Sequence, residues 1–474
     1  MIDPLSGRCG RLPAKAREAA VSANENRLSV EQLREHVATG QVDTVVVAFP
    51  DMQGRLQGKR IHAQFFMDSV LEAGTEGCNY MLAVDVDMNT VEGYAISSWE
   101  RGYGDMEFVP DMSTLHLTPW LPGTAAVMCD LVWLDEDHSP VVESPRAVLG
   151  RQVAKAAERG LVAFAGTELE FIVFNNTFED AWDKRYLGLT PANQYNVDYS
   201  LLGTARVEPL LRDIRNGMYE AGLTVESAKG ECNLGQHEIA FKFDEVVRTA
   251  DNHSIYKNGA KEIASLHGKA LTFMAKFDEN EGNSCHIHMS LRGSDGSTVF
   301  DEGEGQTALF EHFLAGVQDT MCELTLMYAP NINSYKRFQP GSFAPTSTAW
   351  GYDNRTCSLR VVGHGAGLRM ENRLPGGDVN PYLAIAAMLG SGLRGIEKEL
   401  PLGPAMEGNA YTSDHRQVPT SLRAARDLFA ESEVAREILG DEVVAHYTNY
   451  ADVELTAYDA TVTDWERVRG FERL

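Results

Sequence analysis

The sequence predicts an α+β protein with two domains, the larger of which is built on a curved sheet with flanking helices. Short strands mixed with only one or two helices run to about residue 137, a pattern typical of a small α+β domain. A cap followed by proline, Ser144-Pro145, then opens a new helical region. Several later strands are polar on one face and apolar on the other, which favours a sheet curved around a polar site. A chain of 474 residues with 43% hydrophobic content is long enough for both domains.

The predicted N-terminal domain covers residues 28–139, with the boundary placed within residues 136–140. Ser29 is a suitable cap for the first helix, and Gly40 would end that helix. The expected elements are a helix over 29–37, strands over 43–50 and 55–61, a helix over 64–73 and a strand over 80–87. Residues 1–27 are rich in Arg, Ala and Gly but lack the continuous apolar core of a secretory signal, so we expect a loose, disordered tail.

The predicted C-terminal domain covers residues 140–474. Its first helix runs from Ser144-Pro145 to Gly160 and precedes a strand that holds Glu168 and Glu170. A long polar loop over 175–199 follows. The further expected elements are helices over 208–221, 251–267, 307–328 and 381–400, and strands over 224–228 and 236–243. The last 55 or so residues are expected to be mainly helical.

Composition excludes some classes of partner. With 42 Lys and Arg residues against 68 Asp and Glu residues, the net charge of −26 argues against nucleic acid and anionic membranes. No apolar run reaches the length of a membrane span. Seven scattered cysteines without a CxxC motif indicate a reduced, cytoplasmic protein without a disulfide framework.

Carboxylates recur on the polar faces of the predicted strands. Alternation places Glu168 and Glu170 on one strand face, about 7 Å apart, where they repel each other unless a positive group lies between them. Taken singly, such a pair is more often a solvated surface, and the other polar strands also have ordinary explanations. Together they predict one cavity lined by carboxylates and imidazole, which suits Mg²⁺ or Mn²⁺ rather than Zn²⁺. The other members are Glu231, Glu238, His286, His288, Ser290, Glu371 and Arg373.

Arginines gather late in the chain and complete this pattern. Surface charge is the simplest interpretation of any one of them, but in an acidic chain they suit the binding of phosphate or carboxylate. The four are Arg337, Arg355, Arg360 and Arg373. No GxxxxGK[ST] motif is present, so phosphates would not be bound by a P-loop. Carboxylates and arginines together predict phosphoryl transfer governed by positioning and charge neutralisation.

Six spaced motifs resemble those of glutamine synthetase, in the order of that family and from about Leu28 onward. They are Thr167 to Phe171, Glu231 to Glu238, Ser284 to Ser290, Asn333 to Arg337 with Pro340-Gly341, Asn354 to Thr356, and Glu371 to Arg373 with Asn380 to Tyr382. The resemblance implies an N-terminal β-grasp domain and a catalytic domain with a curved antiparallel sheet. It also implies a homo-oligomer, two stacked hexamers forming a dodecamer, with sites between subunits.

The resemblance also implies a role for each matched residue. The metal nearer the amino-acid substrate would be held by Glu170, Glu231 and Glu238. The metal that bridges the ATP phosphates would be held by Glu168, His286 and Glu371. Positions matching ATP contacts are Phe243, His288 and Ser290, together with the phosphate-binding Arg355 and Arg360. Positions matching the glutamate site are Gly282, Arg337 and Arg373. In the implied reaction, the γ-carboxylate of glutamate attacks ATP to give γ-glutamyl phosphate, and an amine then displaces phosphate.

Two departures from the family pattern concern the acceptor amine. Phe343 stands where ammonia-using enzymes carry a glutamate, and the Asp-Gly-Ser-Ser run of their N-terminal domain is absent around residues 80–89. Replacing an anion with a phenyl ring lowers the affinity for a cation and adds an apolar wall. We therefore expect a small organic amine, such as ethanolamine, as the acceptor. Asp85 or Asp87 is a candidate anion on the amine side, although a surface acid is an equally good interpretation.

Three alternatives stay open. A polyamine-specific ligase would suit the acidic charge, and an ammonia-using glutamine synthetase would share the same ligands. A non-catalytic relative would be expected to have lost metal ligands, whereas all six matched positions are present. The regulatory tyrosine of the family is only faintly echoed at Tyr411, where we expect no adenylylation.

Overall fold

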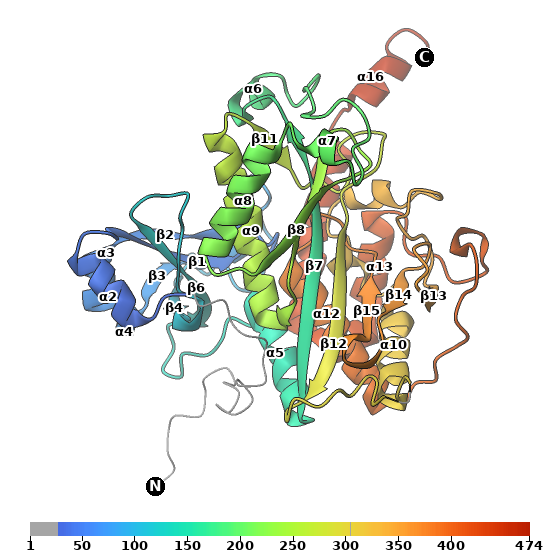
Figure 1. Ribbon diagram of the computed structural model, residues 1–474, viewed down its shortest axis with the longest axis horizontal. Helices are drawn as coiled ribbons and strands as arrows, with labels where there is room; N and C mark the ends of the chain where they lie inside the picture. Colours follow the sequence, from blue (N-terminus) through green and yellow to red (C-terminus); the bar gives the residue numbers. More distant parts are fainter. Residues whose placement is uncertain (1–26, 304) are drawn as a thin grey trace.

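The computed structural model describes residues 27–303 and 305–474, which form two sheets covered by helices (Figure 1). The predicted α+β fold class is confirmed. The expected tail therefore lies outside the described residues except for Arg27, whose guanidinium donates to Thr114 O at 2.7 Å and to Asn252 Oδ1 at 2.7 Å.

The first sheet comes from the N-terminal part of the chain. Its strand order is β2-β1-β6-β4-β3, with β5 paired to β6. The elements are α2 (Val30–Ala38), β1 (Thr44–Pro50), β2 (Leu56–His62), α3 (Ala63–Phe65), η1 (Phe66–Val70), α4 (Leu71–Ala73), β3 (Thr75–Cys78), η2 (Asn79–Leu82), β4 (Asp105–Pro110), η3 (Met112–Thr114), β5 (His116–Leu117) and β6 (Thr124–Trp133). Ser29 caps α2 as expected, in a capping box with Gln32, and the 51–54 turn joins β1 to an antiparallel β2.

Two N-terminal predictions need correction. The strand expected over 80–87 is wrong, because Asn79–Leu82 form a 3₁₀ turn that runs into a loop. The buried Asn79 side chain donates to Ile96 O at 3.2 Å and accepts from Ser97 Oγ at 2.7 Å, so side-chain bonds hold this stretch in place of a ladder. The helix expected over 64–73 is interrupted by the π turn η1.

The second sheet has nine strands in the order β13-β14-β15-β12-β7-β9-β8, with β10 and β11 paired to β7. The strands are β7 (Leu161–Phe174), β8 (Val225–Gly230), β9 (Gln236–Phe241), β10 (Asp244–Glu245), β11 (Ala270–Thr272), β12 (Cys285–Gly293), β13 (Trp350–Tyr352), β14 (Leu359–Val362) and β15 (Arg369–Asn372). All neighbours are antiparallel except β13 and β14. On β7, Leu169, Phe171 and Val173 are fully buried, as alternation predicts.

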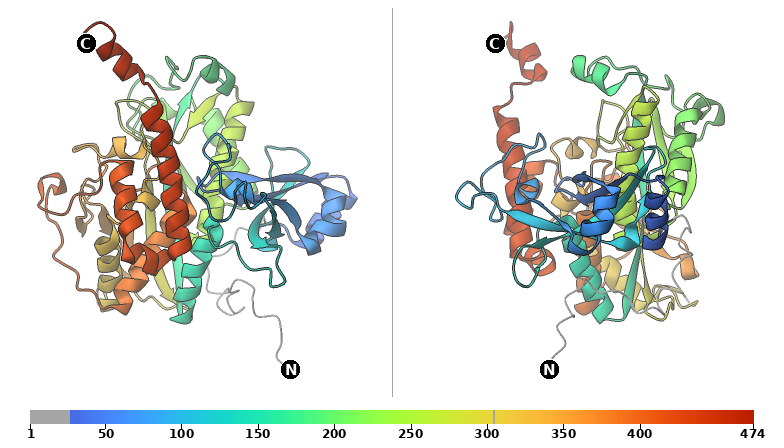
Figure 2. Two further views of the ribbon diagram at one scale, coloured as in Figure 1. Left: turned by 180° about the vertical axis from the view of Figure 1, so that it is seen from behind. Right: turned by 90° about the vertical axis from the view of Figure 1, so that its left-hand side faces the viewer.

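Helices, α5 and α9 among them, cover the apolar side of this sheet. The helices that follow the first sheet are α5 (Pro145–Glu158), α6 (Phe178–Asp183), α7 (Leu201–Thr204), α8 (Glu208–Glu220), α9 (Val246–Leu266), α10 (Ala308–Thr320), α11 (Thr325–Tyr328), α12 (Pro381–Glu397), α13 (Leu422–Glu431), α14 (Glu433–Leu439), α15 (Asp441–Ala460) and α16 (Asp464–Gly470). α5 and α9 pack on β7, and α12 packs on α5, α9 and α10. Figure 2 shows α15 lying along the outside of this layer and α16 projecting beyond it.

Several helix bounds differ from the prediction. The 307–328 region is two helices, α10 and α11; α9 begins five residues before the expected start; and α6 lies within the loop expected over 175–199. Ser144 precedes α5 as expected, but its side chain makes no capping hydrogen bond. No described helix combines the length and the apolar character that crossing a bilayer requires.

A buried ionic network joins the two sheets. The Arg146 guanidinium of α5 contacts Asp111 at 2.7 Å and Asp251 at 3.1 Å, and it also pairs with Asp130. Tyr382 Oη donates to Asp251 at 2.7 Å. Because Asp130 lies on β6 and Asp111 directly follows β4, this network fixes the N-terminal sheet relative to α5, α9 and α12.

Candidate active site

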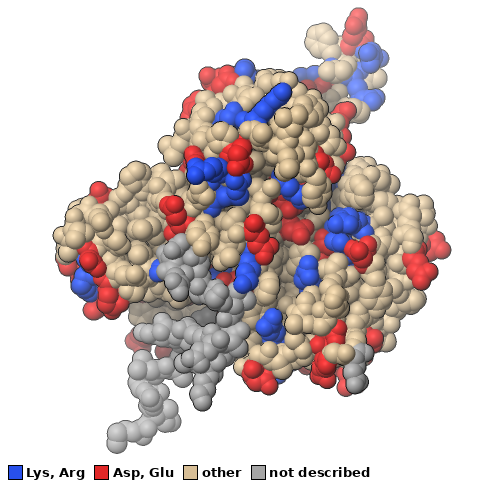
Figure 3. Space-filling model, viewed as in Figure 1, with Lys and Arg blue, Asp and Glu red and all other residues tan. Residues whose placement is uncertain are grey.

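Strand register brings the predicted site residues together on one face of the second sheet. Glu168 lies opposite His286, Glu170 lies opposite Glu238, and Glu371 lies opposite His288. Figure 3, in the orientation of Figure 1, shows acidic side chains in a hollow over the middle of this sheet, with basic side chains around them. Five carboxylates from three strands and one loop thus converge, as the sequence predicts.

The first cluster contains Glu168, Glu371 and two imidazoles. His286 Nδ1 lies 3.4 Å from both carboxylates, and His288 Nε2 lies 2.9 Å from Glu168. One ligand atom from each of Glu168, His288 and Glu371 lies within 4.8 Å of the others. Arg369, which the sequence analysis missed, donates from Nε to His288 Nδ1 at 3.2 Å, so His288 Nε2 carries the proton that Glu168 accepts.

Ionisation in this cluster suits a bound cation. Burial raises the pKa of Glu168, but hydrogen bonds with His286 and His288 outweigh it and hold that pKa far below its usual range. Burial also raises the pKa of Glu371, which the charges of His286 and Arg373 bring below its usual value. Burial and the Arg373 charge lower the pKa of His286. Ionised carboxylates coordinate a metal ion, and the lowered pKa values of Glu168 and Glu371 favour that form.

The second cluster is carboxylate alone. Ligand atoms of Glu170, Glu231 and Glu238 lie within 4.8 Å of one another. Glu170 accepts from Gln236 Nε2 at 3.1 Å and from Ser284 N at 2.7 Å, which fixes its orientation. Burial, reinforced by the surrounding carboxylates although opposed by Lys229, raises the pKa of Glu238 to about 8. A buried carboxylate with so little compensation fits a site for a hard divalent cation.

Arginines lie beside the first cluster. Arg360 Nη1 contacts Glu371 at 2.9 Å, and Arg373 Nη1 contacts the same carboxylate at 2.6 Å. The Nε atom of Arg373 is buried without a hydrogen-bond partner, which leaves a donor for a bound anion. Arg355 is exposed in the turn between β13 and β14, beside the Asp353 that pairs with Arg360.

Two of the predicted glutamate-site residues, Gly282 and Arg337, lie next to the second cluster. Burial lowers the pKa of Arg337 to about 10, and its guanidinium donates to the carbonyls of Leu374 and Arg373 at 2.8 Å each. A Cβ at Gly282 would lie 2.2 Å from Ala275 O and 3.1 Å from Arg337 Cγ, so only glycine lets this backbone approach Arg337. Gly282 O accepts from Gln236, which also holds Glu170.

Phe243, predicted to contact ATP, lies on the opposite face of the sheet from the one that strict strand alternation would give it. Because β9 ends at Phe241, Phe243 turns to the polar face, where it packs against Gly166 and edge-on to Phe164 with ring centroids 6.1 Å apart. Its ring is 39% exposed and free to pack against a planar base. Ser290 lies opposite Phe164 in the β12–β7 register.

The two amine-site candidates lie apart. Phe343 sits in an exposed flap with φ of +58°, and its carbonyl accepts from Arg373 Nη2 at 3.4 Å. A bulky residue held in this region of φ is typical of a functional loop. Asp85 lies in a turn closed by Asn89, close to the Glu454 charge of α15, and within the described residues its side-chain hydrogen bonds join it to Asn89 and not to either cluster.

The end of the loop expected over 175–199 lies beside the second cluster, a contact that the sequence analysis did not predict. Lys229 pairs with Glu231 and lies 3.9 Å from Glu238, while its ammonium packs 5.0 Å from the centre of the Tyr199 ring. Ligand atoms of Asp198, Glu231 and Cys232 also lie within 4.8 Å of one another. Lys229 lies near the end of β8 and Glu231 just after it, but the contact with residues 197–199 is tertiary and has no local signal.

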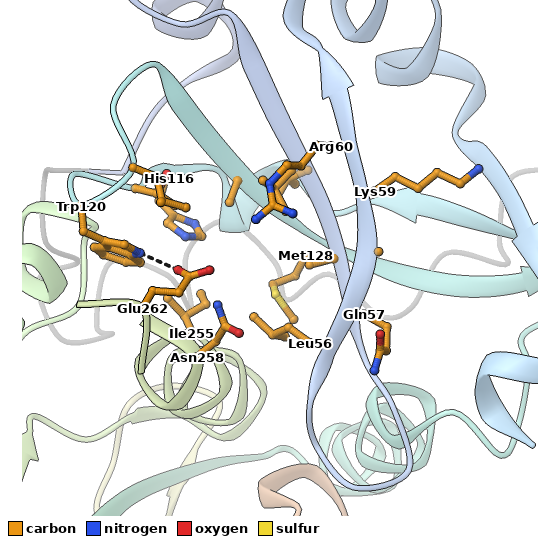
Figure 4. A pocket seen from close by; sticks show the side chains of 17 residues that line it. Leu56, Gln57, Lys59, Arg60, His116, Trp120, Met128, Ile255, Asn258 and Glu262 are labelled. Carbon is orange, nitrogen blue, oxygen red and sulfur yellow. Dashed lines mark hydrogen bonds between the residues drawn. The ribbon is translucent and has the colours of Figure 1, made fainter. Parts of the chain in front are cut away.

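A cavity of about 290 Å³ lies elsewhere, between the first sheet and α9 (Figure 4). Trp120 Nε1 donates to Glu262 at 2.6 Å across its edge. None of the clustered carboxylates lines this cavity, so we do not include it in the candidate active site.

Comparison with known proteins agrees with the fold and the site. Residues 142–469 match the family model described as glutamine synthetase, catalytic domain. A γ-glutamylethanolamide synthetase of Streptomyces coelicolor is 62% identical over 462 residues, covering 98% of this chain and 100% of that protein. A glutamate–isopropylamine ligase of a Pseudomonas species is 37% identical, covering 94% and 99%. A solved structure described as a GmaS/ADP complex superimposes with a TM-score of 0.81 at 26% identity, covering 93% and 99%.

The fold, the paired clusters and these relatives define an enzyme of the ATP-dependent carboxylate–amine ligase class. The chain belongs to the glutamine synthetase family, as its motifs predict. Ligases of this family use ATP and divalent metal ions.

Proposed function

We propose that the enzyme joins the γ-carboxylate of glutamate to a small organic amine, with ethanolamine as the acceptor, and that it forms γ-glutamyl phosphate from ATP on the way. The end-to-end identity of 62% with a γ-glutamylethanolamide synthetase carries this proposal. The geometry supports it, because carboxylate clusters and guanidiniums lie on one sheet face.

Two or more divalent ions, Mg²⁺ or Mn²⁺, would occupy the clusters. Glu170, Glu231 and Glu238 would hold one ion, and Glu168, Glu371 and an imidazole would hold another. His286 suits this role better than His288, because Arg369 and Glu168 already use both nitrogens of His288. When bound, the ions would offset negative charge on the ATP phosphates and on the glutamate carboxylate.

The chain's own residues would position both substrates. Phe243 would pack against the adenine, while Arg355 and Arg360 would contact phosphate oxygens. Arg337 and Arg373 would orient glutamate, with the unpaired Nε of Arg373 as a donor to its carboxylate. Both guanidiniums are nearly fully buried, so they need no reorganisation as charge develops on the transferring phosphoryl group.

The flap would exclude water from the acyl phosphate. Tyr411 Oη donates to Ala344 O at 3.0 Å, and Arg373 contacts Phe343 O, so the flap is bound on two sides. The Phe343 ring, 59% exposed in one chain, would form an apolar wall for the carbon atoms of the acceptor. Asp85 would reach a site only from a neighbouring subunit, which agrees with the proposed dodecamer of two stacked hexamers.

The deciding experiment offers the purified enzyme ATP, glutamate, Mg²⁺ and a panel of amines. We expect ADP release to depend on ethanolamine and the product to have the mass of γ-glutamylethanolamide. Ammonia and putrescine in the same panel test the two enzymatic alternatives. Faster formation of glutamine from ammonia than of any amide from an amine would overturn the proposal.

A further inference from the structure

The open side of the second cluster is closed by a loop and a lysine. Gly230 ends β8, and a Cβ there would lie 2.2 Å from Val197 O, so only glycine lets residues 197–199 pack against the strand end. Tyr199 N donates to Gly230 O at 3.4 Å. The sequence Lys229-Gly230-Glu231 therefore places the Tyr199 ring directly over the Lys229 ammonium.

The contacts of the Lys229 side chain show which groups of this site bind an alkylammonium ion. The Lys229 side chain, a primary amine on four methylenes, contacts the Glu231 carboxylate and the face of Tyr199. Tyr199 has a φ of +52° and is 73% exposed, so a bulky residue is held in an unfavourable conformation without burial to compensate for it. Anions and an aromatic face are the groups that bind an ammonium ion.

Lys229 lies on the outer border of the second cluster. On the first cluster's side, Arg360 and Arg373 contact Glu371 and would hold the phosphate to be displaced. The second cluster is bordered on its outer side by exposed Asp198 and Tyr199, with Lys229 between them and the carboxylates. An amine that entered on this outer side of the cluster would meet the Lys229 ammonium.

We propose that Lys229 determines acceptor specificity: its ammonium donates a hydrogen bond to the hydroxyl group of an amino alcohol and repels the second ammonium of a diamine. This inference rests on the proposed function and names the group that distinguishes between its candidate acceptors. An ammonium has three donors and no acceptor, so it pairs with a hydroxyl oxygen but not with another ammonium. Selection of this kind needs a repulsive element as well as an attractive one.

The test compares 3-amino-1-propanol with 1,3-diaminopropane, which differ only in the terminal group. We measure kcat/KM for both, and for ethanolamine, in the wild type, Lys229→Met, Lys229→Arg and Lys398→Met. Lys398 pairs with Glu437 on the surface, so Lys398→Met is a control for the loss of one positive charge. We expect Lys229→Met to raise the diamine-to-amino-alcohol ratio by about 10- to 100-fold, because one repulsive charge is removed at close range. Lys229→Arg and Lys398→Met should keep the wild-type ratio.

A ratio changed less than about twofold in Lys229→Met would overturn the inference while leaving the ligase function intact. Failure of the wild type to use any amine would instead overturn the proposed function. If Lys229→Met loses turnover, calorimetry of both amines with enzyme saturated by Mg²⁺ and ADP decides the matter. Tighter diamine binding in the variant supports the role of Lys229, and unchanged relative affinities contradict it.

Discussion

Glu238 is the carboxylate with the least compensation in the site. Its side chain is buried, its register partner on β7 is another carboxylate, Glu170, and its pKa is raised to about 8. Among the residues that the structure describes, the charge of Lys229 on β8 opposes this repulsion. The position is costly for stability, and a bound divalent cation is the group that would make it favourable.

We therefore predict that Glu238→Gln weakens Mg²⁺ binding at least ~10-fold, since a neutral amide is a poorer ligand for a hard cation. Calorimetric titration of the metal measures this directly, without relying on turnover. Glu226→Gln, on the exposed face of β8, is the matched control and should keep the wild-type affinity. Equal affinities in Glu238→Gln and wild type would remove Glu238 from the ligand set.

The buried His446 side chain makes the stability of the protein depend on pH in the acid range. Burial lowers its pKa to about 3, and it lies against Met52 Sδ at 3.0 Å and the rings of Tyr94 and Tyr447. In the unfolded chain, the His446 imidazole binds a proton below about pH 6.5. In the folded chain, the same imidazole stays neutral until about pH 3. The contribution of neutral His446 to the free energy of unfolding is therefore fully present above pH 6.5. It is lost as the pH falls below 6.5, by ~1.4 kcal/mol per pH unit.

We predict that His446→Gln reduces this acid sensitivity by about one proton, or ~2 kcal/mol between pH 6.5 and pH 5. Thermal unfolding of both proteins at pH 7.5 and pH 5 measures the difference. His138→Gln changes an exposed side chain that contacts Glu107 and should behave like the wild type. A His446→Gln variant that loses as much stability in acid as the wild type would contradict the prediction.

At the scale of elements, α10 and α12 pack backbone to backbone through glycines. A Cβ at Gly316 would lie 2.2 Å from Ser391 O and 2.7 Å from Gly395 Cα. No rotamer relieves a contact between a Cβ and a main-chain atom, so one helix must move. This contact places α12 against α5 and α9, which support β7.

Gly316→Ala is accordingly expected to lower stability by about 1–3 kcal/mol, despite the better helix propensity of alanine. The fall in Tm is the measurement. Gly104→Ala introduces the same methyl group where no atom lies within 4 Å and should leave Tm nearly unchanged. A Gly316→Ala protein with wild-type Tm would mean that the helices separate without cost.

The elements also show how far sequence reasoning reached. Alternation along β7 was sufficient to place Glu168 and Glu170 on the site face, because period 2 is a local property of a strand. The apolar run at residues 80–87 led to the wrong prediction of a strand, since Leu82, Ala83 and Val84 are buried by tertiary packing and not as part of a strand with ladder hydrogen bonds. Phe243 faces the site because β9 ends at Phe241, and the contact of Lys229 with Tyr199 joins residues that only the tertiary fold brings together. Neither feature was predictable from residue spacing.

At the scale of the whole molecule, one hydrophobic core spans both sheets. The Arg146 network crosses the same boundary, so the N-terminal sheet is fixed to the catalytic sheet inside each chain. The same N-terminal sheet would bring Asp85 to a neighbour's site in the proposed ring. Because the N-terminal sheet cannot move relative to the second sheet of its own chain, the position of Asp85 in a neighbour's site would be set by how the subunits pack in the ring.

The C-terminal helix gives this assembly a testable contact. α16 projects from the body in Figures 1 and 2, and none of its residues is buried. Trp465, Val468 and Phe471 are 64%, 72% and 94% exposed. Apolar side chains clustered on a projecting helix mark a protein contact, and another copy of this chain is the partner that the proposed dodecamer supplies.

We predict that removing residues 463–474 divides the proposed dodecamer into hexamers, because the contact between rings loses these apolar anchors. Mass photometry measures the change as a halved particle mass, and Val468→Ser with Phe471→Ser should have the same effect. Glu472→Ala, next to Phe471 but charged, is the control and should leave the mass unchanged. Truncated and full-length proteins of equal subunit number would show that α16 does not join the rings.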